Sequence, residues 1–332
     1  MKLSEQPIWN ILDSSKLDDF LRCRRRYFYS HILGWRPSAP AHDLHFGTCW
    51  HLAREHQLIH GYEDIEGAYS EFLTEYRKIF DESTDDMFIP KTPKGVWEAL
   101  MAFTVHYMRD LEDNELLRNP DTNEPFTEIA GTVPISDSKM LHFRMDSILR
   151  RKSNNKVFSW DHKTTSANYI KYPPWEEQFY LSIQNGTYTH CLYCIFPAEE
   201  VLGVEFCGTG FGHLKRGSTA RPAGYHQEFK RVSAFRTPSQ MNVWLWTVID
   251  LVNEVEMETD RLTHCSDSDS VLQAFPLNPG GCSKYKGCEF HDYCTCWENP
   301  LQQCGEPPLG FIVEFWNPAD KDSRNKMELD WR

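Results

Sequence analysis

The sequence lacks any apolar run long enough to span a bilayer. The longest runs, such as residues 243–252, contain polar residues and fall short of the roughly 20 apolar residues that a spanning helix needs. Residues 1–10 lack the basic stretch and apolar core of a secretory signal, so the cytosol is the expected location. Positive charge is also scarce, with a net charge of -13, which argues against a protein that coats nucleic acid through bulk electrostatics but leaves room for a local basic channel.

What the sequence does contain is typical of a globular protein. Its 332 residues, 40% of them hydrophobic and 25% charged, can bury one large core or two modest ones. It also has 11 cysteines. In a reducing compartment these favour metal or cluster ligation, or simple burial, over disulfides.

The first third of the sequence has the apolar period of α-helices. Ser14 or Ser15 could cap the first helix, and Gly34 follows its expected end, as helix termini prefer. The predicted helices span residues 14–31, 46–59, 62–80 and 94–117.

The middle of the chain changes to the alternation and short apolar runs that are typical of strands. Turn residues at 137–138 and 153–155 separate three such segments. The pattern predicts a three-stranded antiparallel meander at the centre of the core. Its strands are residues 129–135, 140–150 and 157–163.

Beyond the meander, the pattern predicts a helix over 176–194, an extended segment over 201–214, and a helix from 237 to about 262 that begins with a capping sequence. From residue 276 onward Gly, Pro and Cys dominate, and we expect a metal to order this tail. The fold class is therefore α/β, with a mixed sheet flanked by helices. The three predicted regions are a helical N-terminal region, 1–125, a core, 126–265, and a cysteine-rich C-terminal lobe packed on the N-terminal helix, 266–332.

Two carboxylates and one lysine form the clearest chemical pattern. Asp146 lies within one predicted strand and Asp161 near the end of the next, so antiparallel pairing would bring them together. Asp161 and Lys163 are two residues apart on a strand and therefore share a face. Carboxylates are ligands for Mg²⁺ or Mn²⁺, while a lysine can orient a water and offset charge on a phosphate. On this triplet alone, a solvated strand end with an ion pair is the competing interpretation.

Four further residues could join this site. His51, on a predicted helix, could supply a nitrogen ligand, and Glu128, just before the meander, a further carboxylate. Taken singly, each is better explained as an ordinary packed or surface residue. Gln184 and Tyr188 are one helical turn apart, as a pair reaching a phosphate or a catalytic group would be.

The order and context of these residues resemble the PD-(D/E)XK nuclease superfamily in its RecB-like branch, over about residues 15–188. The resemblance implies a restriction-endonuclease-like core that hydrolyses DNA phosphodiesters with a metal. In it, Gln184 and Tyr188 would orient the scissile strand or Lys163. The residues that carry the resemblance are His51, Asp146, Asp161-His162-Lys163 and Gln184-x-x-x-Tyr188.

The same resemblance implies a ligand set. Asp146 and Asp161 would hold one or two Mg²⁺ or Mn²⁺ ions, and His51 with the backbone carbonyl of His162 would complete the shell. Lys163 would position the attacking water, and the metal would stabilise charge in the transition state.

Residues 17–29 extend the resemblance toward the N-terminus. They look like the cysteine helix of the iron-sulphur members of this branch, which include bacterial recombination nucleases, phage exonucleases and CRISPR-adaptation exonucleases, with Arg24 in place of the usual proline. Arg24, Arg25 and Arg26 cover too much of a helix circumference for all to be buried, and we expect at least one to bind a DNA phosphate.

The cysteine-rich tail would complete a cluster site. Its C-x5-C-x5-C spacing and the distant Cys23 together offer the four thiolates of a [4Fe-4S] cluster. Cys296 could replace Cys294, and zinc held within the tail, with Cys304 or His291 as a ligand, is the alternative to iron and sulphur. The four predicted cluster ligands are Cys23, Cys282, Cys288 and Cys294.

The resemblance alone favours an exonuclease over an endonuclease. Its partner would be DNA, as single strands or duplex ends, in a bacterial or phage-infected cell during recombination, repair, phage DNA processing or CRISPR adaptation; no membrane partner is expected. Two rivals remain open. One is a catalytically silent DNA-binding or recombination-partner module stabilised by zinc or an iron-sulphur cluster, and the other is a zinc-stabilised protein whose carboxylates are incidental. Intact Asp146, Asp161 and Lys163 argue against the silent module.

Overall fold

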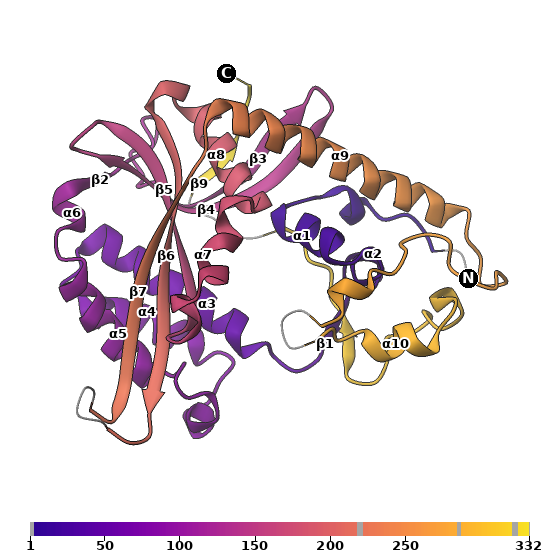
Figure 1. The fold of residues 1–332 in the computed structure, drawn as a ribbon, viewed down its shortest axis with the longest axis horizontal. Coiled ribbons are helices and arrows are strands. Elements are labelled where there is room, and N and C mark those ends of the chain that lie inside the picture. The colour runs from indigo at the N-terminus through magenta and orange to yellow at the C-terminus, as the bar shows by residue number, and fades with distance from the viewer. Residues whose placement is uncertain (1–2, 218–221, 284–286, 321–324, 332) are drawn as a thin grey trace. The chain divides into compact units, whose positions relative to one another are not determined.

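The structure is a computed structural model that describes residues 3–217, 222–283, 287–320 and 325–331 (Figure 1). The chain divides into two compact units. Each unit combines segments that are distant in the sequence, whereas the three predicted regions follow the order of the chain. The first unit contains residues 1–39, 132–143 and 242–322, and the second contains 40–131, 144–241 and 323–332.

A seven-stranded mixed sheet, most of which belongs to the second unit, confirms the predicted α/β class. Its order is β7-β6-β5-β4-β3-β9, with β2 paired to β4. The β4–β5 and β6–β7 pairs are antiparallel, and β5–β6 is parallel. The strands are β2 (Asn114–Leu116), β3 (Thr127–Ser136), β4 (Lys139–Arg151), β5 (Lys156–Ser166), β6 (Val201–Leu214), β7 (Gly224–Phe235) and β9 (Asn325–Glu328).

Helices cover both faces of this sheet. Successive side chains of β6 point to opposite faces, so Phe211 packs with Phe46 and Trp50 on one face, while Phe206 stacks on Phe179 on the other. Each such buried aromatic contributes ~1.5–3 kcal/mol relative to exposure. The helices of the first face are α3 (His42–His60), α4 (Ile65–Tyr76) and α5 (Pro93–His106), and those of the second are α7 (Pro173–Tyr180) and α8 (Ile183–Ile195).

Two predicted helices of this unit differ from the expected ones. The helix predicted over 94–117 stops at His106, because a short helix, α6 (Asp110–Asp113), follows and the chain then enters β2. The helix predicted over 176–194 is divided into α7 and α8. Ser182 separates them by capping α8, its side chain accepting from the backbone N–H of Asn185 at 3.2 Å.

The first unit contains the N-terminal helices and the cysteine-rich tail. Its helix predicted over 14–31 is interrupted at Cys23, whose φ of -168° and ψ of 118° are extended. Asp13, rather than Ser14 or Ser15, caps the first segment. The elements are α1 (Ser14–Arg22), α2 (Arg24–Tyr27), η2 (Phe28–Ile32), β1 (Trp35–Pro37), most of α9 (Pro238–Thr263), α10 (His291–Cys296), and β8 (Phe311–Val313), which pairs with β1.

The start of α9 follows the predicted capping box. The backbone N–H of Thr237 donates to Gln240 Oε1 at 2.8 Å, and the N–H of Gln240 donates back to Thr237 Oγ1 at 3.3 Å. None of the helices in the described ranges combines the length and hydropathy needed to cross a membrane. The short helical turns are η1 (Pro7–Asn10), η3 (Glu82–Phe88), η4 (Tyr169–Lys171), η5 (Ala198–Glu200), η6 (Pro279–Gly281) and η8 (Pro300–Gln302).

Candidate active site

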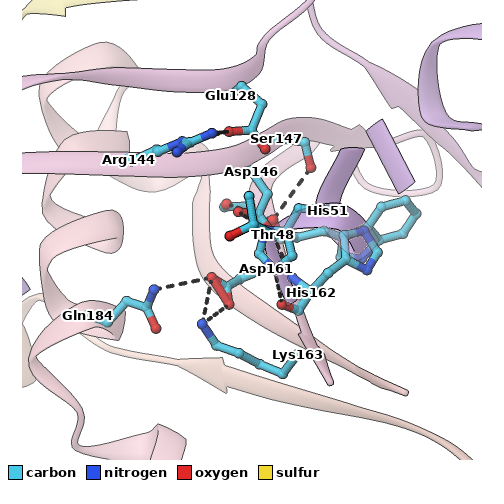
Figure 2. A network of polar contacts seen from close by, with 12 residues as sticks. Thr48, His51, Glu128, Arg144, Asp146, Ser147, Asp161, His162, Lys163 and Gln184 are labelled. Atoms are coloured by element: carbon cyan, nitrogen blue, oxygen red, sulfur yellow. Dashed lines mark hydrogen bonds and ion pairs between the residues drawn. The ribbon is translucent and has the colours of Figure 1, made fainter. Parts of the chain in front are cut away.

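The candidate site lies where the ladder between β4 and β5 ends. The last paired residues are Ser147 and Trp160, and the next residue of each strand beyond that pair is Asp146 on β4 and Asp161 on β5. Beyond that pair, the backbone N–H of His162 donates to Asp146 Oδ2 at 2.7 Å. A carboxylate has therefore taken the place of a strand carbonyl, and the two predicted aspartates come together as antiparallel pairing requires (Figure 2).

Helix α3 brings His51 to the same point. Its Nε2 lies 2.6 Å from the backbone carbonyl oxygen of His162, and its Nδ1 lies 3.1 Å from Asp146 Oδ1. The imidazole and the carbonyl oxygen are two of the predicted metal ligands. The structure thus brings both beside Asp146, although α3 is about 90 residues earlier in the chain.

Glu128, at the start of β3, is a carboxylate that the sequence suggested only as an addition. It is 6% exposed and has a φ of +46°, in the left-handed region that side chains rarely adopt. Arg144 Nε donates to its Oε2 at 2.6 Å. Within the described part of the chain, His51, Glu128 and Asp146 form the one group of three potential ligands whose donor atoms all lie within 4.8 Å of each other.

Asp161 belongs to a second set of contacts beside this group. Lys163 Nζ lies 2.7 Å from its Oδ2, and Gln184 Nε2 donates to its Oδ1 at 3.3 Å (Figure 2). Gln184 also donates to the hydroxyl of Tyr188 at 2.9 Å. The predicted face of α8 therefore does reach the strand that carries Asp161 and Lys163.

Crowded negative charge controls the protonation of the site. Although burial opposes it, the charge of Asp146 raises the pKa of His51 to about 9. Burial, and then the charge of Asp146, raises the pKa of Glu128. Burial, opposed by Lys163, raises the pKa of Asp161 to about 6. Three carboxylates thus share a space in which a proton on His51 and the cations of Lys163 and neighbouring Arg144 supply the balancing positive charge.

The residues present fit a divalent cation. Carboxylate and carbonyl oxygens are the ligands that Mg²⁺ and Mn²⁺ prefer, and the neutral imidazole of His51 would add one nitrogen donor. A cation bound by His51, Glu128 and Asp146 would replace the proton on His51 as the source of positive charge. The arrangement therefore has both the donor atoms and the excess negative charge of a cation site.

The three N-terminal arginines have protein partners in the first unit. Arg24 and Arg26 form ion pairs with carboxylates of that unit at 2.7 and 3.0 Å. Arg25 is 5% exposed and donates to the carbonyl of Phe275 at 2.9 Å. A DNA contact from these arginines stays a prediction, and Arg25 would have to leave its carbonyl partner to make one.

The four predicted cluster cysteines also lie in the first unit. Burial, followed by the charges of the Cys23 and Cys288 thiolates, raises the pKa of Cys282. Burial, opposed by Arg25, and then the charges of the other three thiolates raise the pKa of Cys294 to about 11. Such coupling decays with distance, so the four thiols lie near one another.

A mixed sheet that places carboxylates and a lysine where the pairing of two central strands ends is the arrangement expected of a metal-dependent nuclease. A sequence model of the PD-(D/E)XK nuclease superfamily matches residues 14–295. Because this match covers most of the 332 residues, the chain belongs to that superfamily, and the predicted family is confirmed. A search of curated proteins finds no match.

Proposed function

We propose that this chain is a Mg²⁺- or Mn²⁺-dependent deoxyribonuclease that degrades DNA as an exonuclease. The observation that carries the proposal is the convergence of donor atoms from His51, Glu128 and Asp146 beside the Asp161–Lys163 pair, in a chain of the PD-(D/E)XK nuclease superfamily. Bound there, the cation would polarise the scissile phosphate and lower the pKa of a water.

The chain's own residues would then act around that phosphate. Lys163, held at 2.7 Å by Asp161, would orient the attacking water and offset the charge that develops on the phosphate oxygens. Gln184, which bonds both Asp161 and Tyr188, would fix the orientation of the Asp161 carboxylate. Asp161 and the His162 carbonyl would complete the cation's ligands.

The first unit would hold a [4Fe-4S] cluster on Cys23, Cys282, Cys288 and Cys294. Their mutual electrostatic coupling supports this set over one with Cys296, which is exposed.

The RecB-like resemblance supports the finer assignments. It favours degradation from DNA ends in the cytoplasm of a bacterial or phage-infected cell, in recombination, repair, phage DNA processing or CRISPR adaptation. An end requirement separates the exonuclease from an endonuclease directly: the protein should degrade linear DNA and leave closed circular DNA of the same sequence intact.

The test is cleavage of end-labelled DNA with Mg²⁺ or Mn²⁺. Wild-type protein should cleave, and Asp161→Asn should not, while keeping its circular dichroism spectrum. The same assay applies to Lys163→Ala, and Lys156→Ala is its matched control. Lys156 is at the other end of β5 and donates to a backbone carbonyl there. Folded wild-type protein that binds DNA without cleaving it would instead favour a catalytically silent module.

A further inference from the structure

Four exposed side chains lie in the segment that connects Lys163 to Gln184. Three are tyrosines, at the turn η4, at the start of α7 and at its end, and the fourth is a leucine next to the last tyrosine. We call this set the tyrosine surface. Its members and their exposed fractions are Tyr169 (43%), Tyr172 (59%), Tyr180 (40%) and Leu181 (87%).

The tyrosine surface lies on the face of the sheet to which Asp161 and Lys163 point. In the parallel β5–β6 register, Asp161 is opposite Phe206 and Lys163 is opposite Gly208, so each pair shares a face. Phe206 stacks on Phe179 of α7, with ring centres 4.3 Å apart.

Gly208 brings the start of α7 equally close. A Cβ at Gly208 would overlap the ring of Trp175, one helical turn after Tyr172. A larger residue at position 208 would therefore displace the Trp175 ring from the strand beside Lys163. Both ends of α7 are thus held next to the candidate active site.

The backbone of the tyrosine surface is held in place although its rings are exposed. The N–H of Trp175 donates to the carbonyl of Tyr172 at 3.1 Å. The carbonyl of Tyr180 accepts from Asn185 at 3.3 Å and from Arg236 at 2.8 Å. The backbone that carries the rings is therefore fixed before a ligand binds, which lowers the entropy lost on binding.

The charges around the tyrosine surface favour a ligand that stacks on the tyrosine rings over one that binds through its phosphates. Lys171 pairs with Glu228 at 2.8 Å, and Lys230 pairs with Glu176 at 2.6 Å. These cations are already neutralised, so a duplex, which offers mainly its phosphates, gains little here. An unpaired base offers a flat apolar face that stacks on an aromatic ring whatever its sequence.

We propose that the tyrosine surface binds unpaired bases by stacking and makes single-stranded DNA the preferred substrate. This inference rests on the proposed nuclease function, because it concerns which form of DNA brings its phosphates to Lys163. A base stacked on Tyr172 would place its neighbouring phosphate on the face where Asp161 and Lys163 act.

The test compares binding of single-stranded and duplex oligonucleotides that contain 2-aminopurine, a base whose fluorescence falls on stacking. It uses the full chain with Lys163→Ala, so that the strand is not consumed. Adding Tyr169→Ala and Tyr172→Ala should weaken single-strand binding about tenfold or more and remove the fluorescence loss, because stacking on one ring contributes at least about fivefold in affinity.

Two variants separate ring stacking from a general loss of apolar surface. Tyr172→Phe, which keeps the ring, should restore the fluorescence loss. Met87→Ala removes a side chain that is 77% exposed in η3, next to Phe88, which stacks on His42 of α3 on the opposite face of the sheet. It should leave single-strand affinity unchanged.

Three results would overturn the inference, and they separate it from the proposed function. If wild-type protein cleaves DNA but the double tyrosine variant binds single strands normally, the tyrosine surface is not a base site. If duplex binding weakens as much as single-strand binding, the surface does not select unpaired bases. If wild-type protein cleaves no DNA with either cation, the proposed function fails, and this inference fails with it.

Discussion

Binding of Mn²⁺ to the metal-free protein should release about one proton from His51. In the structure both ring nitrogens of His51 face acceptors, Asp146 Oδ1 at 3.1 Å and the His162 carbonyl at 2.6 Å, so the metal-free imidazole is protonated. With a pKa of about 9, roughly 97% of it carries the proton at pH 7.5. A metal ligand must be neutral, and the proton therefore has to leave.

The sign of the pH dependence follows from this competition. Below pH ~9 the proton competes with the metal, so apparent Mn²⁺ affinity should rise about tenfold per pH unit between pH 7 and 8.5. Asp161, with a pKa of about 6, is largely deprotonated over that range and contributes little.

Isothermal titration in two buffers of different ionisation enthalpy measures the protons released. His51→Ala should lower the count at pH 7.5 by about one and flatten the pH dependence, while weakening Mn²⁺ binding. An identical proton count in wild type and His51→Ala would refute the reasoning, because His51 would then not be a ligand. Lys156→Ala, at the far end of β5, is the control for a general effect of substitution.

Three further predictions concern the remaining elements of the account. Lys163→Ala should lower the cleavage rate by about 10²–10⁴-fold with little change in DNA affinity, measured in single-turnover assays; a loss below about tenfold would remove Lys163 from the mechanism. Cys23→Ser should abolish iron content and lower the melting temperature, whereas Cys296→Ser should do neither; equal iron in both would place all the ligands in the tail. Contacts with His31 and Arg26, although burial opposes them, lower the pKa of Asp19 to about 2. Because the folded-state pKa is the lower one, Asp19 should stabilise the fold by about 2 kcal/mol above pH ~4, and this should be lost as the pH falls toward 2. The free energies of unfolding in urea of wild type and Asp19→Asn should therefore differ at pH 6 and converge near pH 2. A difference that stays constant with pH would contradict this role of Asp19.

Local patterns predicted much of the fold and the core of the site. The strand alternation and the capping residues Thr237 and Gln240 act over a few residues, so the sequence showed the meander and the start of α9. The spacing of Asp161 and Lys163 on one strand predicted their shared face directly.

What the sequence could not show depends on tertiary contacts. For Glu128 the one local signal was a carboxylate just before a strand. Its place within 4.8 Å of donor atoms of His51 and Asp146 depends on α3 and the end of the β4–β5 ladder coming together beside it. The break in the helix at Cys23 sets the direction of the Cys23 side chain toward the tail. The helix propensities of the residues around it do not predict this break.

The tail is also better packed than its composition suggests. Phe290, within the tail, and Phe275, just before it, are fully buried, and their rings pack against Tyr29 and Tyr27. These aromatics provide apolar contacts that the Gly, Pro and Cys content of the tail does not suggest. A cluster would therefore add to an existing core rather than supply all of the stabilisation.

The central claim is that Asp161 and its neighbours hydrolyse DNA with a divalent cation. Its most direct test is the cleavage rate of end-labelled single-stranded DNA by wild type and Asp161→Asn, purified identically, with and without Mn²⁺. The account predicts cleavage by wild type only when Mn²⁺ is present, and none by a folded Asp161→Asn protein. Equal cleavage by both proteins, or none by folded wild type with either Mn²⁺ or Mg²⁺, would contradict it.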